Sequence, residues 1–307
     1  MVNTAEKKRK KKWVEPTASP KWFRILNGGF MILLSAIFAI PFVLIAIASF
    51  TPEIEITSKG FQFFPSSLTL YNYEYLFGSS DKFTQALFTT TALTLVGTFN
   101  TLFFTSLGAY ALSRKYLPYR KIITFYVFLT MLVGGGVIPW YMVVRNLGMI
   151  DTFFALFVPG TIATWNLIVM RNSFMALPAS VEETAKIDGA GDFTVVFRII
   201  LPISKPIMAT MIVYLAVGYW NEWYSPMLFI TKHTELYTLQ YLLREIFSAN
   251  ASMTSRGGMA MMMRDQPRPS ESLKMAAAMI ATVPILCVYP FLQKYFVHGI
   301  MIGSIKE

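Results

Sequence analysis

Six long apolar stretches constrain the fold of this chain more than any other feature of its sequence. A helix needs about 20 apolar residues to cross a lipid bilayer, and six stretches approach or exceed that length. They cover residues 28–50, 85–113, 122–143, 152–170, 206–230 and 275–292. With 54% hydrophobic and only 14% charged residues, the chain is also too apolar for an ordinary soluble domain. We therefore predict an all-α membrane protein with six transmembrane helices.

The distribution of lysine and arginine predicts how these helices cross the membrane. Six consecutive basic residues stand at positions 7–12, and the loops after the second and fourth stretches are also basic. Because positive loops stay in the cytoplasm and six spans bring both ends to one side, we predict cytoplasmic N- and C-termini. The loop at 231–274 carries six basic residues on the other side, but long loops follow this rule least. We expect the basic run to contact anionic membrane lipid and not nucleic acid.

The same pattern divides the chain into three parts. We predict a basic cytoplasmic segment at 1–27, a transmembrane domain at 28–300 and a cytoplasmic tail at 301–307. A polar loop at 175–205 interrupts the transmembrane domain on the cytoplasmic side. We expect no removable signal peptide, because no short apolar stretch with a cleavage site directly follows the basic run. Cys287 is the only cysteine, which excludes an internal disulfide.

The polar loop is amphipathic, and its residues predict two short helices. Ser180 and Glu183 have the spacing of a capping box, so the first helix should begin at Val181. Gly189 should end it, because glycine readily takes the left-handed conformation after a helix. This helix is expected to expose Glu182, Glu183, Lys186 and Asp188.

Asp192 can cap the second helix, and Pro202 should end it. Its apolar face is expected to comprise Phe193, Val196, Phe197 and Ile200. Two helices with a bend between them could plug into a cleft of a soluble partner. The alternative is a re-entrant turn that lies on the bilayer surface.

An ionisable residue, Glu222, stands in the fifth apolar stretch. A carboxylate deep in a membrane costs several kcal/mol unless it is paired or hydrated, so Glu222 either lines a path or lies at the wet outer end. Trp220, Asn221, Trp223 and Tyr224 around it offer ring faces and hydrogen-bonding groups that suit sugars. An aromatic belt at the membrane interface is the competing interpretation. In a continuous helix, Trp220 and Tyr224 would share a face and Trp223 would be displaced from it.

The third stretch carries a break signal. Glycines at 134–136 and Pro139 indicate a broken or closely packed helix, which a membrane tolerates only against protein or a water-filled path. Tyr141 follows the break and is a further candidate for lining a path. The external loop at 51–82 is rich in aromatic residues, which could dock an external partner or pack over the helix ends.

Motifs of catalysis and of nucleotide binding do not occur in the sequence. There is no GxxxxGK[ST] loop, so the chain cannot hold nucleotide phosphates in the usual way and energy must come from another subunit. His233 and His298 are the only histidines, and there is no HExxH motif, nucleophile elbow or pair of acids within a span. We therefore expect a chain that is not an enzyme and has no metal site.

The spacing within the polar loop resembles the EAA loop of the membrane subunits of ABC importers. The matching residues are Glu183, Ala185, Gly189, Ile199, Leu201 and Pro202. Thr184 departs from the pattern, replacing an alanine by another small residue. Further runs resemble MalG-like and LplC-like permeases of carbohydrate (oligosaccharide) importers that depend on a binding protein. These runs are SKGFQFFPSSLTLYNYEYLF, GGGVIPWYMVVRNLGMIDT, WNEWYSPM, YPFLQKYF and HGIMIGSIKE.

This resemblance implies a type I ABC importer permease fold with a cytoplasmic pair of coupling helices, in the bacterial cytoplasmic (inner) membrane. The implied partners are a second homologous permease, two cytoplasmic ATPases that bind ATP and Mg²⁺, and an extracytoplasmic solute-binding protein that delivers an oligosaccharide. The implied mechanism is alternating access. The implied coupling residues are Glu183, Ala185, Asp188, Gly189, Leu201 and Pro202. An ABC permease for amino acids or peptides is the nearest alternative, followed by a secondary transporter and a membrane-embedded enzyme.

Overall fold

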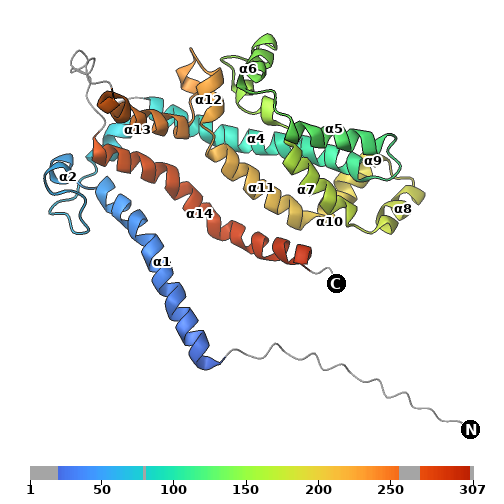
Figure 1. The fold of residues 1–307 in the computed structure, drawn as a ribbon, viewed down its shortest axis with the longest axis horizontal. Coiled ribbons are helices and arrows are strands. Elements are labelled where there is room, and N and C mark those ends of the chain that lie inside the picture. Colours follow the sequence, from blue (N-terminus) through green and yellow to red (C-terminus); the bar gives the residue numbers. More distant parts are fainter. Residues whose placement is uncertain (1–19, 79–80, 256–269, 305–307) are drawn as a thin grey trace, which may run out of the picture.

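The computed structural model of the chain, drawn in Figure 1, describes residues 20–78, 81–255 and 270–304. Some predictions concern residues outside these ranges. They are those for the basic run at 7–12, for residues 256–269 of the loop at 231–274, and for the end of the tail at 305–307. Within the described ranges every regular element is a helix and no strand occurs, so the all-α prediction is confirmed.

The first half of the chain forms helices of very different length. They are α1 (Lys21–Ser49), α2 (Glu53–Lys59), α3 (Tyr71–Gly78), α4 (Asp81–Ser113), α5 (Arg120–Leu132), α6 (Val137–Asn146), the 3-10 turns η1 (Phe153–Leu156) and η2 (Val158–Gly160), and α7 (Thr164–Met175).

The second half contains the polar loop and the last two apolar stretches. Its helices are α8 (Ala179–Ile187), α9 (Asp192–Thr194), the π-helix η3 (Val195–Ile200), α10 (Leu201–Ile203), α11 (Lys205–Trp220), α12 (Tyr224–Phe229), η4 (Thr234–Leu236), α13 (Leu239–Ser255) and α14 (Glu271–Ser304).

Three helices of the described ranges, α1, α4 and α14, are each long and apolar enough to cross a membrane. Three bent pairs reach the same length and hydropathy only when taken together. These pairs are α5 with α6, η1–η2 with α7, and α9–α10 with α11. The structure therefore has three clear spans, and six if each bent pair counts as one.

The break in the third stretch lies where the sequence predicts it. The axes of α5 and α6 differ by 116°, and Gly136 between them has a φ of 82°. A residue with a side chain is strained in that conformation, so the glycines permit the sharp turn.

Two other stretches are also broken, although they were predicted as continuous helices. Residues 152–170 begin with the 3-10 turns η1 and η2, and α7 starts only at Thr164 after a bend of 52°. Pro159 and Gly160 lie at this break, where one lacks an N–H and the other weakens a helix. Residues 206–230 divide into α11 and α12, separated by residues 221–223.

Helix α4 forms the axis of the packing. It contacts α7 and α11 along its length, while α14 packs against α1 and α11 (Figure 1). Its face toward these neighbours is rich in buried small and hydroxyl residues, among them Thr101 and Thr105, which let helices approach closely.

The aromatic loop at 51–82 contains the helices α2 and α3, and part of it packs over a helix end, while docking of an external partner stays a prediction. Tyr73 packs on the end of α1, where its hydroxyl lies 2.8 Å from the Oγ atom of Ser49. Phe64, by contrast, is 91% exposed. Glu53 of α2 accepts the backbone N–H groups of Glu271 and Ser272 at 3.1 and 2.9 Å, so it caps the start of α14.

Candidate functional site

The polar loop begins with α8, and a glycine ends this helix. The N–H group of Gly189 donates a hydrogen bond to the backbone carbonyl oxygen of Lys186 at 3.0 Å. The N–H group of Ala190 donates to the oxygen of Ala185 at 2.9 Å. Together these bonds form a Schellman motif, with Gly189 at the left-handed position and a φ of 83°. The predicted end of the first helix is therefore confirmed.

The start of α8 differs from the prediction. The helix begins at Ala179 rather than Val181. Its N-cap is Pro178, and no side chain caps it, so the predicted capping box of Ser180 and Glu183 does not form. The physical reason is that Pro178 fixes its own backbone and the helix starts directly after it, which places Ser180 inside the first turn.

The start of the second predicted helix also differs from the prediction. Its N-cap is Gly191 rather than Asp192, and no side chain caps it. The helix passes through the π segment η3 and continues beyond Pro202 to Ile203, before an 85° bend at Ser204. The helix therefore ends one residue after Pro202, so its predicted end is right to within one residue.

The predicted apolar face of this second helix is only partly buried. Val196 and Ile200 are buried, as is Val195, while Phe193 is 74% exposed and Phe197 is 39% exposed. The wider turn of a π-helix changes which residues share a face. Two aromatic rings therefore remain on the surface of the loop.

Glu182 is buried, contrary to the prediction that α8 exposes it. Its carboxylate forms an ion pair with Arg114 and lies 3.1 Å from the Lys186 ammonium. The hydroxyls of Tyr110 and Tyr116 donate to it at 3.0 and 3.1 Å. These contacts join α8 to the end of α4 and to the connection that follows it. We call these five residues the Glu182 cluster.

The charges of the Glu182 cluster stabilise one another. Burial alone would raise the pKa of Glu182. The hydrogen bond from Lys186 and the positive charge of Arg114 have the larger combined effect, so the pKa lies below its usual range. The hydrogen bond with Tyr116 raises the pKa of Lys186 above its usual range, and the hydrogen bond with Glu182 adds a smaller effect in the same direction. The Lys186 ammonium also lies 3.9 Å from the centre of the Tyr116 ring. The cluster is therefore a charged clamp at neutral pH.

The predicted coupling residues are not all exposed. Ala185 packs in the buried cluster that contains Phe174 and Met170, and Leu201 is half-buried beside it. Glu183, Asp188, Gly189 and Pro202 are exposed. Of the two adjacent acids in α8, one therefore holds the helix to α4 and the other faces outward. Their role in coupling stays a prediction.

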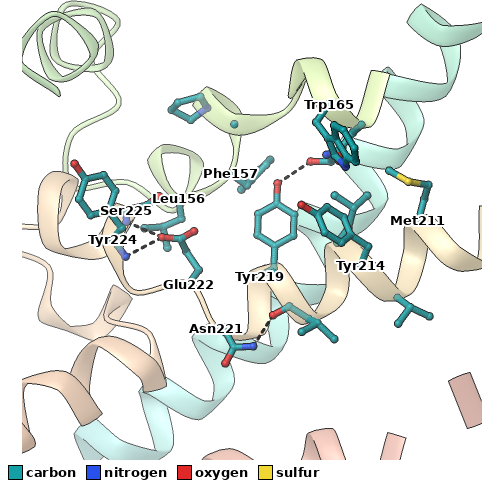
Figure 2. A pocket seen from close by; sticks show the side chains of 18 of the residues that line it. Leu156, Phe157, Trp165, Met211, Tyr214, Tyr219, Asn221, Glu222, Tyr224 and Ser225 are labelled. Carbon is teal, nitrogen blue, oxygen red and sulfur yellow. Dashed lines mark hydrogen bonds between the residues drawn. The ribbon is translucent and has the colours of Figure 1, made fainter. Parts of the chain in front are cut away.

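A cavity of about 760 Å³ lies beside α11, between this helix and the segment from η1 to α7 (Figure 2). Six aromatic residues contribute to its walls: Trp140, Phe157, Trp165, Tyr214, Tyr219 and Tyr224. Its polar lining comprises Thr101, Asn166, Thr210, Asn221, Glu222 and Ser225. Aromatic faces with a few hydrogen-bonding groups are suited to the rings and hydroxyls of sugars.

The ring of Tyr219 is held against α4 by two contacts. Its hydroxyl lies 2.7 Å from the Thr101 Oγ atom of α4. Gly97, one turn earlier on α4, faces the ring so closely that an added Cβ atom would lie 2.8 Å from it. The glycine and the threonine together seat the ring against α4, where it forms a wall of the cavity.

Glu222 does line the cavity, but it does not lie within a continuous helix as expected. It stands in the break after α11, where its Oε1 atom accepts the N–H groups of Tyr224 and Ser225, both at 2.8 Å. These bonds cap the start of α12 and direct the carboxylate toward the cavity wall (Figure 2). Thr238 also donates to the Glu222 carbonyl oxygen.

The aromatic residues beside Glu222 point in different directions. Trp220 is outside the cavity lining, and its Nε1 atom donates to the oxygen of Ala281 in α14 at 3.0 Å. The ring of Trp223 instead stacks against the guanidinium group of Arg244, whose central carbon lies 3.7 Å from the centre of the ring. The expectation that Trp220 and Tyr224 share a helical face is wrong, because α11 ends between them.

Asn221 lies at the rim, where its side-chain amide donates to the oxygen of Val217 at 2.8 Å. Tyr141 packs against Phe229 with ring centres 6.2 Å apart and does not line the cavity, whereas its neighbour Trp140 does. Substrate contact by Tyr141, Trp220 and Trp223 stays a prediction that this geometry does not favour.

Several lining residues were not singled out from the sequence, chiefly Trp165, Tyr214 and Tyr219. The sequence of α11 did contain a signal for the side of the helix that lines the cavity. Four lining residues recur there at helical spacing, namely Thr210, Tyr214, Val217 and Asn221. Trp165 of α7 carries no such signal, since only the fold brings it to the same space. In the described ranges, no group of three or more histidine, cysteine or acidic residues is arranged to hold a metal ion.

Comparisons with known proteins agree on one group of relatives. The chain is 39% identical to the polygalacturonan/rhamnogalacturonan transport system permease protein YtcP of Bacillus subtilis (strain 168), over 92% of this chain and 98% of the relative. It is also 39% identical to protein LplC of the same organism, over 94% of this chain and 97% of the relative.

A solved structure is similar as well. It belongs to a bacterial ABC transporter involved in the import of the acidic polysaccharide alginate, and it matches with a TM-score of 0.78 and 27% identity. The match covers 92% of this chain and the whole of the other. No protein-family model matches the chain.

Proposed function

The chain belongs to the family of permease subunits of sugar and oligosaccharide ABC transporters, and from this premise we propose that it carries an oligosaccharide into a bacterial cell in an ATP-driven importer. The observation that supports this substrate class is the cavity of about 760 Å³ with six aromatic residues in its wall. Such a volume is in the usual range for a small-molecule site. A subunit of this kind is a transport component and not an enzyme.

The importer that we propose has several subunits. A second homologous permease would complete the path beside α11, and a solute-binding protein outside the cytoplasmic membrane would deliver the sugar. Two ATPases in the cytoplasm would bind ATP and Mg²⁺ and supply the energy. Two exposed acids, Glu183 in α8 and Asp188 directly after it, support an ATPase contact at this helix. They are charged and have no ion-pair partner in the described part of the chain.

The way α8 is attached supports alternating access as the mechanism that we propose. The Glu182 cluster fixes α8 to the end of α4, and α4 carries Gly97 and Thr101, which seat the Tyr219 ring in the cavity wall. A movement of the ATPases that shifts α8 would therefore reach the cavity through one continuous helix. We infer that this helix transmits the opening and closing of the path.

Uptake by the assembled importer tests the proposal. The four membrane and ATPase subunits are reconstituted in liposomes, and the loaded binding protein is added on the side of residues 51–82. We expect accumulation of a labelled oligosaccharide that requires ATP on the opposite side and survives collapse of ion gradients. Uptake that needs an ion gradient and no ATP would establish a secondary transporter instead. Uptake of labelled peptides in place of the sugar would overturn the substrate class.

A further inference from the structure

Two arginines from different helices converge on one backbone carbonyl at one end of the molecule. Arg120 is the first residue of α5, and Arg171 lies in the last turns of α7. Their Nε atoms donate to the carbonyl oxygen of Leu112 at 3.0 and 3.1 Å. Leu112 is in the last turn of α4, where carbonyl groups have no partner within the helix. The two guanidinium groups are therefore close neighbours.

These two positive charges have no acidic partner in the described ranges, since neither arginine belongs to any of the ion pairs found there. The other contacts of their guanidinium groups are with the Met175 sulfur at 3.4 Å and with the Asn172 side-chain oxygen at 3.3 Å, both neutral. Like charges held together repel, so an anion that bridges them would be favoured.

The start of α5 strengthens the preference for an anion. Its N-cap is Tyr119, no side chain caps it, and no acidic residue lies in its first turn. The free N–H groups and the dipole at such an end attract negative charge. The forked guanidinium group in addition matches the oxygens of a phosphate.

The surroundings identify the source of the phosphate. No residue of α5 is buried, and Ile122, Phe125 and Tyr126 are 65 to 68% exposed. Tyr116 and Tyr119, just before α5, are also exposed, as aromatic residues are at the level of lipid headgroups. We propose that Arg120 and Arg171 bind the phosphate of an anionic phospholipid whose acyl chains lie along the apolar surface of α5.

Native mass spectrometry of the full chain in detergent, titrated with phosphatidylglycerol or phosphatidylcholine, tests the site. Wild type should bind the anionic lipid more tightly than the zwitterionic one. The double variant Arg120→Gln/Arg171→Gln should bind phosphatidylglycerol about tenfold or more weakly, since it loses charge-assisted hydrogen bonds. The matched control is Lys115→Gln/Lys121→Gln, which removes the same charge from two exposed neighbours and should bind as wild type.

Four outcomes would overturn the proposal. The first is equal binding of both lipids by wild type, a result that does not depend on whether the variant folds. The second is an equal loss in the control, which would mean diffuse attraction. The third is displacement of the lipid by millimolar inorganic phosphate, which would mean a site for free phosphate. The fourth is unchanged lipid binding by the arginine variant together with loss of co-purifying subunits, which would mean a protein interface.

Discussion

At the scale of a single residue, Gly97 sets how closely α4 can approach the ring of Tyr219. An alanine there would bring its Cβ atom within 2.8 Å of the ring, which is held in place by Thr101. Alanine gains about 1 kcal/mol over glycine in a helix, but overpacking costs about 1–3 kcal/mol. We therefore expect Gly97→Ala to lower the Tm of the purified subunit and to raise the KM for sugar uptake as the ring moves into the cavity.

A matched control and a double variant separate crowding from other effects. Gly29→Ala in α1, where an added Cβ atom meets nothing within 4 Å, should leave the Tm unchanged or raise it slightly. Tyr219→Ala should cost less stability in the Gly97→Ala background than in wild type, because the clash is then absent. Additive effects of the two substitutions would contradict this account of the contact.

We expect Asp151 to make the connection after α6 sensitive to pH. The N–H groups of Lys232 and Thr231 donate to its carboxylate at 2.8 and 2.6 Å and hold its pKa well below the usual range. This stabilisation is complete above the pKa of the unfolded chain, about 3.9, and is lost as the pH falls through the folded value. Asp151→Asn should therefore lower the Tm near pH 7, with a smaller difference from wild type near pH 3. A difference that is the same at both pH values would show that the charge has no role.

Single residues also show what the sequence could and could not predict. Gly189 was predictable because its role depends on the backbone of its own turn. Glu182 was not, because its partner Arg114 is 68 residues away in the sequence and only the fold brings the two together. The same holds for the cavity, where Asn221, Glu222 and Tyr224 were found as neighbours in sequence while Trp165 was missed.

At the scale of an element, α8 depends on the charge of Glu182. Replacing it by glutamine keeps the shape but leaves Arg114 without a counter-charge in a site where both side chains are about nine-tenths buried. Breaking a buried pair in this way costs about 3 kcal/mol. We expect Glu182→Gln to lower the Tm and to speed hydrogen exchange in α8, while the exposed neighbour variant Glu183→Gln changes neither. Equal behaviour of the two variants would mean that the cluster does not hold the helix.

The end of α8 allows a test of coupling without loss of the fold. Gly189→Val introduces a branched side chain at a φ of 83°, at a cost of about 1 kcal/mol or more. Glu183→Ala removes an exposed acid. Both variants should insert into the membrane at normal levels and yet bind or stimulate the ATPase poorly, so uptake should fall far more than protein level. Normal uptake with full ATPase stimulation in both would exclude α8 as the coupling helix.

The breaks within the apolar stretches show the same limit of prediction at the level of elements. The turn at Gly136 was evident, because three consecutive glycines and a nearby proline cannot continue a helix. The break at 221–223 was not, because these residues include neither glycine nor proline. It is stabilised by Glu222, which caps α12, and by Thr238, which reaches it from the start of α13. The cap from Glu222 is local and the hydrogen bond from Thr238 is not, and hydropathy reports neither of them.

At the scale of the whole molecule, α4 connects the two candidate regions. Its C-terminal end carries Tyr110 of the Glu182 cluster, and its middle carries Gly97 and Thr101 beside the cavity. A helix transmits displacement over its length because its backbone hydrogen bonds are continuous, and α4 has no break between residues 81 and 113. The polar loop and the cavity therefore both contact the same continuous helix.

The orientation of the molecule in the membrane gives the last prediction. Helices α2 and α8 lie at opposite ends of the structure, with α4 and α11 running between them (Figure 1). Phe64 in the loop after α2 and Lys186 in α8 are both exposed, so cysteines at these positions should react with a maleimide. The lone native cysteine is exposed and must first be removed by Cys287→Ser. Because the basic loops mark the cytoplasmic side, an impermeant maleimide should label Phe64→Cys in intact cells and Lys186→Cys only after permeabilisation. Labelling of the cysteine at 186 in intact cells would reverse the orientation and remove the basis for an ATPase contact at α8.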